Sequence, residues 1–169
     1  MRTFVAALLL LSTALPLTAK GRTVKIVIAG DSLATPLEIV GTQASAFSIW
    51  AGPGVFVDGE EQIEGFIIEW KRGIVEPPQG LQKLEVSFYT GCDLGESGCN
   101  TQEHRLAYVV TYAWRGGKEA GLVYLPGPRD EAARINVTMT HGHGYEGHWL
   151  RATAAWDDVV RPLLEKNRR

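Results

Sequence analysis

The sequence has no basic run and little net charge. Its 17 lysines and arginines are balanced by 19 acidic residues, which gives a formal net charge of −2 over 169 residues. Proteins that bind nucleic acid usually carry a basic patch or stripe, and segments that bind anionic lipid carry clusters of lysine and arginine. Because this sequence has neither, it argues against nucleic acid or an anionic membrane surface as the partner.

The sequence also lacks an apolar run long enough to cross a bilayer. Its main candidate follows Met1-Arg2 and covers residues 4–15, fewer than the ~20 residues that a transmembrane helix needs. One positive charge, a short apolar run and a small residue, Ala19, are typical of a secretory signal peptide. We expect cleavage after Ala19, with residues 12–14 as a second possible site and an uncleaved anchor as the less favoured alternative.

The rest of the chain, residues 20–169, suits a single globular domain with one core. Hydrophobic residues make up 45% of the sequence and include five tryptophans, which excludes a disordered chain. Cleavage at the first site would remove only one charged side chain, Arg2, and change the net charge from −2 to about −3. We therefore expect a secreted or periplasmic protein that does not span a membrane once it is processed.

Cysteine is scarce, with only Cys92 and Cys99 in the sequence. Two cysteines in an exported protein are typical of one disulfide. Six residues separate them, a spacing that matches neither a Cys-x-x-Cys redox pair nor a zinc-binding pair. We expect a structural Cys92–Cys99 disulfide at the tip of a hairpin, and the chain-entropy model gives so short a loop about 2–3 kcal/mol of stabilisation.

Two predicted strands flank this cysteine loop. Residues 84–89 alternate between apolar and polar side chains, which indicates a strand with one buried face. Residues 106–114 are apolar on both faces, as in a central strand with a cover on each side. A helical turn is predicted over 42–48, and further strands are predicted over 23–29, 36–40, 66–70, 121–125 and 135–140.

The C-terminal region predicts one amphipathic helix. Thr153 can cap its start, and Pro162 should kink it or divide it in two. Strands separated by turn-length gaps indicate an antiparallel sheet rather than alternating strands and helices. We expect an α+β fold, mainly β: an antiparallel sheet or sandwich with this helix packed on it. The apolar stripe of the helix consists of Trp156, Val159, Val160, Leu163 and Leu164.

The tetrapeptide Gly30-Asp31-Ser32-Leu33 resembles the nucleophile motif of the GDSL (SGNH) esterase and lipase family. The resemblance implies that Ser32 attacks an ester carbonyl after a histidine of a C-terminal Asp-x-x-His removes its proton. This sequence contains no Asp-x-x-His and no Gly-x-Asn-Asp, and a strand-like run follows where the family has a helix. A polar turn is therefore the favoured explanation. The alternative is an ester hydrolase that uses Ser32 with Asp31 and His148.

Histidines form a second candidate site. In an extended segment His141 and His143 would point to the same side, and His148 could complete a three-nitrogen copper or zinc site. Glu146 would be a further ligand or a base. The glycines between them would hold the ligands loosely, and no side chain that would orient them is evident. Surface histidines are the favoured explanation, so we predict no cofactor, with a copper- or zinc-binding protein as the alternative.

Acidic residues gather at positions 58–64, where Asp58, Glu60, Glu61 and Glu64 could bind calcium. They do not follow the Asp-x-Asp-x-Asp-Gly pattern of calcium loops. A solvated acidic loop is the favoured explanation.

Three aromatic residues of the central strand, Tyr108, Tyr112 and Trp114, share one face. Packing in the core would explain them, because aromatic side chains dominate cores. If that face is open, the same stripe would form a binding face for a ligand or a partner. The sequence does not decide between these two alternatives.

Four short blocks, residues 66–70, 85–89, 123–127 and 155–156, resemble an uncharacterised family of exported bacterial proteins. The resemblance covers most of residues 20–169. It implies export and a single compact domain and points to no catalytic activity. Our leading hypothesis is a secreted or periplasmic binding or structural module, not an enzyme, whose partner is a small molecule or a protein.

Overall fold

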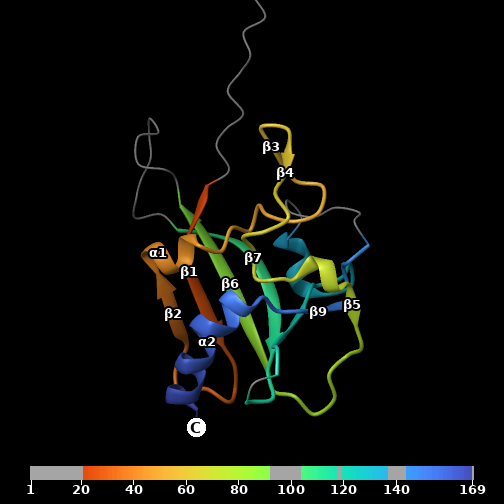
Figure 1. Ribbon diagram of the computed structural model, residues 1–169. Coiled ribbons are helices and arrows are strands. Elements are labelled where there is room, and N and C mark those ends of the chain that lie inside the picture. Colours follow the sequence, from red (N-terminus) through yellow and green to blue (C-terminus); the bar gives the residue numbers. More distant parts are fainter. Residues whose placement is uncertain (1–20, 92–103, 118, 137–143, 169) are drawn as a thin grey trace, which may run out of the picture.

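The computed structural model describes residues 21–91, 104–117, 119–136 and 144–168 (Figure 1). Within them, seven strands form one sheet in the order β2-β1-β6-β7-β8-β9-β5, and every pairing is antiparallel. The predicted α+β, mainly β fold with a C-terminal helix is confirmed. The strands of this sheet are β1 (Arg22–Ala29), β2 (Leu37–Val40), β5 (Ile74–Val75), β6 (Lys83–Gly91), β7 (Arg105–Ala113), β8 (Leu122–Tyr124) and β9 (Trp149–Arg151). The other elements are the hairpin strands β3 (Phe56–Val57) and β4 (Glu60–Glu61), the helices α1 (Gly41–Ser45) and α2 (Ala154–Asn167), and the short 3₁₀ helices η1 (Trp70–Arg72) and η2 (Glu131–Arg134).

The long strands β6 and β7 form the centre of the sheet, and the central position predicted for residues 106–114 is confirmed. They pair from Lys83↔Ala113 to Thr90↔Arg105, with one irregularity after Phe88. Their inner face carries aliphatic and aromatic side chains that belong to the main core. Cys92 and Cys99 lie outside the described residues, so the disulfide stays a prediction.

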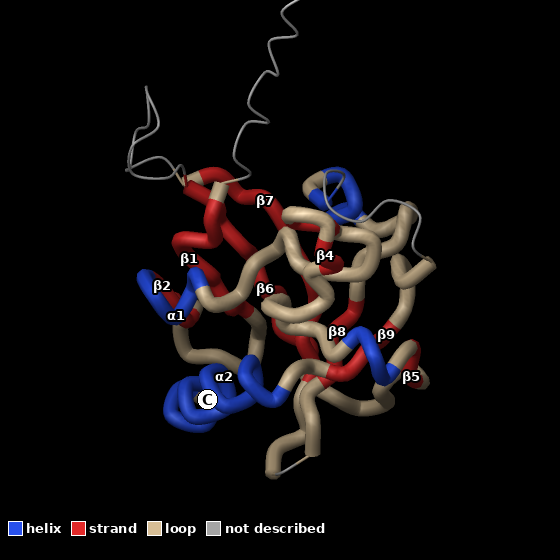
Figure 2. Tube along the Cα trace, turned by 45° about the horizontal axis from the view of Figure 1, so that its top comes forward, coloured by secondary structure: helices blue, strands red, loops and turns tan. Residues whose placement is uncertain are grey.

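Helix α2 covers the inner face of the sheet, on the same side as α1 (Figures 1 and 2). Thr153 caps it as predicted, because its Oγ1 accepts the Trp156 N–H at 3.2 Å. The Trp156 ring is fully buried and packs edge-on against Phe47 and Tyr112. Pro162 lies inside a continuous helix and does not divide it. Among the described residues, no helix has both the length and the apolar character needed to cross a membrane.

Side-chain hydrogen bonds fasten the segment after β8 to β8 and β7. The Tyr124 hydroxyl donates to Asp130 Oδ2 at 2.7 Å. The Asn136 side chain accepts the Val109 N–H at 2.7 Å and donates to the Val109 carbonyl at 2.6 Å. Strand β8 pairs with β7 only over residues 111–113, so Asn136 provides hydrogen bonds to the strand edge that β8 leaves free.

Two of the predicted strands differ from the structure in the residues that it describes. Residues 66–70 do not form a strand but a buried connection that contains one isolated bridge, Ile68↔Ala152, and leads into η1. An apolar run alone does not separate a strand from a buried loop, which is why the prediction was wrong. Of the strand predicted over 135–140, the described part is a 3₁₀-like turn, and residues 137–140 lie outside the described residues.

Candidate functional site

A cavity of about 340 Å³ opens between the first turn of α2 and residues 63–71, the connection that includes the buried residues 66–68 and Trp70. Most of its wall is apolar. The charged side chains Glu64, Glu69 and Lys71 belong to the wall, as does Thr153 at the start of the helix. The apolar residues that line it are Phe47, Ile63, Phe66, Ile68, Trp70 and Ala155.

Backbone hydrogen bonds hold the connection in place. The Ser48 N–H donates to the Gly65 carbonyl at 2.7 Å, and the Thr153 N–H donates to the Ile67 carbonyl at 2.9 Å. Gly65 has a φ of +104°, a backbone angle that residues other than glycine rarely adopt. The connection is thus fastened to the α1 side of the core and to the start of α2, so the cavity is part of the fold.

Two aromatic rings of the cavity wall, Phe66 and Trp70, form what we call its floor. Phe66 stacks on Trp70 with 6.3 Å between ring centroids, and it contacts Phe88 at 5.4 Å and Tyr108 at 5.8 Å. Both floor rings are buried. Rings held in this way present a preformed apolar surface, which lowers the ordering cost of binding.

Two ion pairs lie on the charged side of the cavity, which we call its rim. Lys71 Nζ lies 3.1 Å from Glu64 Oε1, and Arg72 Nε lies 3.1 Å from Glu69 Oε1. All four side chains are largely exposed, and exposed pairs contribute less than about 1 kcal/mol each. A ligand can therefore rearrange them at little cost.

The β3–β4 hairpin precedes the rim residues in the chain and projects from the fold (Figure 1). Its two-residue turn, Asp58-Gly59, has positive φ at both positions, as in a type I′ turn. Glu61 Oε1 accepts the Gly54 N–H at 2.7 Å, which fixes the base of the hairpin. Phe56 is 65% exposed, so the hairpin carries an aromatic ring in solvent.

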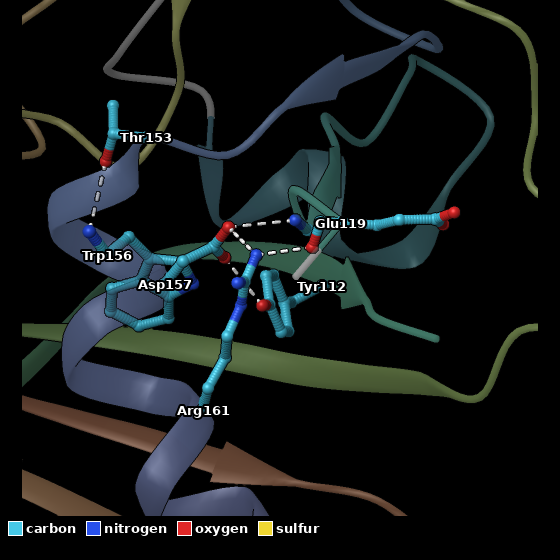
Figure 3. A network of polar contacts seen from close by, with 7 residues as sticks. Tyr112, Glu119, Thr153, Trp156, Asp157 and Arg161 are labelled. Atoms are coloured by element: carbon cyan, nitrogen blue, oxygen red, sulfur yellow. Dashed lines mark hydrogen bonds and ion pairs between the residues drawn. The ribbon is translucent and has the colours of Figure 1, made fainter. Parts of the chain in front are cut away.

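A second polar cluster lies inside the core, around Asp157 (Figure 3). This carboxylate is 3% exposed, and it accepts the Tyr112 hydroxyl at 2.7 Å and the Gly121 N–H at 2.9 Å. Arg161 donates to Asp157 and to the Glu119 carbonyl. Burial, followed by the negative charge of Asp157, raises the pKa of Tyr112 well above its usual value.

The contacts of this cluster are internal to the fold. A Cβ on Gly121 would lie only 2.3 Å from Cε2 of Tyr112, so no space for a substrate lies between them. The cluster joins α2 to β7 and to the chain that precedes β8. Its geometry is that of a structural anchor.

The structure does not bring the proposed hydrolase residues together. Ser32 lies in the turn between β1 and β2, beside a hollow of about 20 Å³, and no histidine or carboxylate among the described residues lines it. Asp31 is exposed, and His148 is exposed just before β9. Three strands separate β1 from β9, which is a distance of about 19 Å across the sheet.

The proposed metal site lies mostly beyond what the structure describes. His141 and His143 are outside the described residues, and the backbone carbonyl of His148 accepts the Leu125 N–H at 3.1 Å. Within the described residues, which include the acidic positions 58–64, no three His, Cys, Asp or Glu side chains are grouped so that they could hold a metal ion.

The aromatic stripe of β7 is part of the core and not an open binding face. Tyr108, Tyr112 and Trp114 are 3%, 0% and 7% exposed. Phe66 covers the first ring, Trp156 covers the second, and the Arg161 guanidinium lies 5.8 Å from the centre of the third. The alternative of an open binding face is therefore wrong for these three residues, because α2 and the buried connection occupy that side of the sheet.

Sequence reasoning missed the cavity because it assigned residues 66–70 to a strand. One signal was available: charged residues Glu69, Lys71 and Arg72 directly follow an apolar run, which fits a chain that leaves the core for the surface. Comparison with protein-family models, with curated proteins and with solved structures finds no match for this chain. Function is therefore inferred from the geometry of the cavity.

Proposed function

We propose that this protein is a binding module whose cavity beside the start of α2 takes an apolar group of its ligand. The carrying observation is a preformed volume of about 340 Å³ with an aromatic floor and a charged rim. Ligand sites in proteins have volumes of roughly 300–1,000 Å³, mostly apolar walls and a few polar groups that orient the ligand.

The polar groups of the wall support a binding role over a catalytic one. Thr153 Oγ1 accepts a hydrogen bond as the helix cap, and Glu64 and Glu69 pair with neighbouring cations. Nucleophilic catalysis needs a nucleophile within hydrogen-bond reach of a base that a third group orients. The wall residues do not form such a chain of contacts.

A small aromatic probe tests the proposal. Indole titrated into ¹⁵N-labelled protein should shift the amide signals of Gly65, Ile68 and Lys71. Ala155→Phe should abolish these shifts, because Ala155 lines the cavity. Ala154→Phe is the matched control, since Ala154 is exposed in the same helical turn but does not line the cavity. Both substitutions cost about 0.5 kcal/mol in helix propensity.

The proposal is contradicted if indole causes no shift around the cavity at any concentration, or if the Ala155→Phe protein binds it as well as the parent. Loss of binding in both variants would also count against the site, because it would show that binding depends on the helix and not on the cavity.

We further propose that the protein acts in the periplasm or outside the cell. The support is the leader-like pattern of residues 1–19, which lie outside the described residues. Expression of the full chain with a C-terminal tag in a bacterium should yield a processed protein in the periplasmic or secreted fraction. Mass spectrometry should place its N-terminus at Lys20. An unprocessed chain in the cytoplasm would contradict this.

A further inference from the structure

We infer that the natural occupant of the cavity is an apolar side chain of a basic peptide segment, whose lysines or arginines face the β3–β4 hairpin. This inference depends on the proposed function and names its partner class. It combines three observations: the apolar cavity, the acidic charge beside it and the exposed Phe56 ring.

The acidic excess of the chain is concentrated beside the cavity. Residues 56–72 contain five acidic and two basic side chains, a net charge of −3, while the whole chain carries −2. The two cations, Lys71 and Arg72, already pair with Glu64 and Glu69. Among the described residues, the three hairpin carboxylates have no cation within ion-pair distance. They are Asp58, Glu60 and Glu61.

These carboxylates lie next to the cavity along the chain. Glu61 is two residues before Ile63 of the cavity wall, at most about 7 Å away by backbone length. The Gln62 N–H donates to the Val55 carbonyl at 2.7 Å and fixes that part of the hairpin. A peptide with its apolar anchor in the cavity would therefore place a neighbouring basic side chain within reach of Glu61.

The exposed ring of Phe56 extends the same surface. Phe56 lies on β3 and pairs with Glu61 of β4, the strand that also carries Glu60. A peptide that runs from the cavity along the hairpin meets apolar and acidic groups in turn. An anionic membrane or a nucleic acid would instead meet negative charge, which disfavours association.

Fluorescence anisotropy with three labelled peptides tests the inference. Each peptide has a central tryptophan; lysines flank it in the first, glutamates in the second and glycines in the third. The lysine peptide should bind roughly tenfold more tightly than the glutamate peptide. Its affinity should fall as salt is raised, because salt screens exposed charges. Ala155→Phe should abolish binding of the lysine and glycine peptides, and Ala154→Phe should not.

A charge-neutralised hairpin gives the second arm. The double variant Asp58→Asn/Glu60→Gln keeps the turn, since Asn tolerates positive φ, and it leaves the Glu61 hydrogen bond intact. It should weaken the lysine peptide roughly threefold and leave the glycine peptide unchanged. The matched control is Glu131→Gln/Glu165→Gln, which removes the same charge from exposed residues of η2 and α2.

The outcomes separate the two proposals. If the glycine peptide or indole binds but the lysine peptide has no advantage, the inference is overturned and the binding module stands. If the hairpin variant and its control weaken the lysine peptide equally, local charge plays no part and the inference is also overturned. If no peptide and no indole binds, both proposals fail.

Discussion

The Tyr112 hydroxyl donates a 2.7 Å hydrogen bond to Asp157 Oδ1, which connects the central strand β7 to helix α2 within the core. Asp157 also accepts the Gly121 N–H and pairs with Arg161. One carboxylate thus has three partners from three parts of the chain. A buried group with this many contacts is costly to remove, because each partner is then left without its hydrogen bond.

Asp157→Ala should therefore lower the free energy of unfolding by about 3–5 kcal/mol, the usual cost of breaking a buried ion pair. Tyr112→Phe should cost less, about 1–2 kcal/mol, because Asp157 keeps its other two donors. Urea denaturation followed by tryptophan fluorescence measures both. The neighbouring Asp158→Ala is the control, since Asp158 is exposed and its loss should cost less than about 0.5 kcal/mol. Equal losses at the two aspartates would show that the network does not stabilise the fold.

The raised pKa of Tyr112 predicts a loss of stability at high pH. In the unfolded chain this hydroxyl ionises near pH 10, whereas burial and Asp157 keep it protonated in the folded protein. Above about pH 10 the unfolded state therefore binds fewer protons than the folded state, and the stability present below that pH is lost as pH rises. The unfolding free energy of Tyr112→Phe should fall less steeply than that of the parent, by up to about 1.4 kcal/mol per pH unit.

The parent itself is not a clean reference for one tyrosine, because burial and Asp130 also raise the pKa of Tyr124. The difference in slope between the parent and Tyr112→Phe removes this contribution. Identical slopes above about pH 10 would mean that Tyr112 ionises as readily in the folded protein as in the unfolded chain.

Local patterns were sufficient to predict much of the fold. The alternation of β6, the two apolar faces of β7 and the stripe and cap of α2 are all local signals, and each led to the right element. Strand β9, Trp149–Arg151, was missed: its three residues show no alternation, and no Gly- and Pro-bounded apolar run marks it as residues 121–125 mark β8. Residues 66–70 were misassigned because their side chains are buried by α2 and the aromatic core, which are distant in sequence.

The candidate site could not be predicted in the same way. Its wall combines Phe47, the connection 63–71 and the first turn of α2, segments that only the tertiary fold brings together. Asp157 shows the same limit: it does not belong to the predicted apolar stripe of the helix, yet it is buried. Its partners Tyr112 and Gly121 lie 45 and 36 residues away in the sequence. The acidic segment 58–64 was visible in the sequence, but neither its hairpin nor its position beside a cavity was.

The Cys92–Cys99 disulfide stays a prediction, and it is simple to test. Protein from an oxidising compartment should resist alkylation until it is reduced, and mass spectrometry counts the added groups. Reduction, or the double change to serine, should lower the unfolding free energy by about 2–3 kcal/mol. Two thiols that react before reduction would contradict the disulfide.

Gly121 provides the sharpest test of how tightly the core network is built. A Cβ at this position would lie 2.3 Å from Tyr112 Cε2 and 2.4 Å from its hydroxyl oxygen. Gly121→Ala must therefore push the ring away and break its hydrogen bond to Asp157, which we expect to cost about 2–4 kcal/mol. In a Tyr112→Leu background the clashing atoms are absent, so the same alanine should cost much less. A double-mutant cycle from denaturation midpoints measures this coupling. If the two costs simply add, the close approach of Gly121 to Tyr112 is not what requires glycine there.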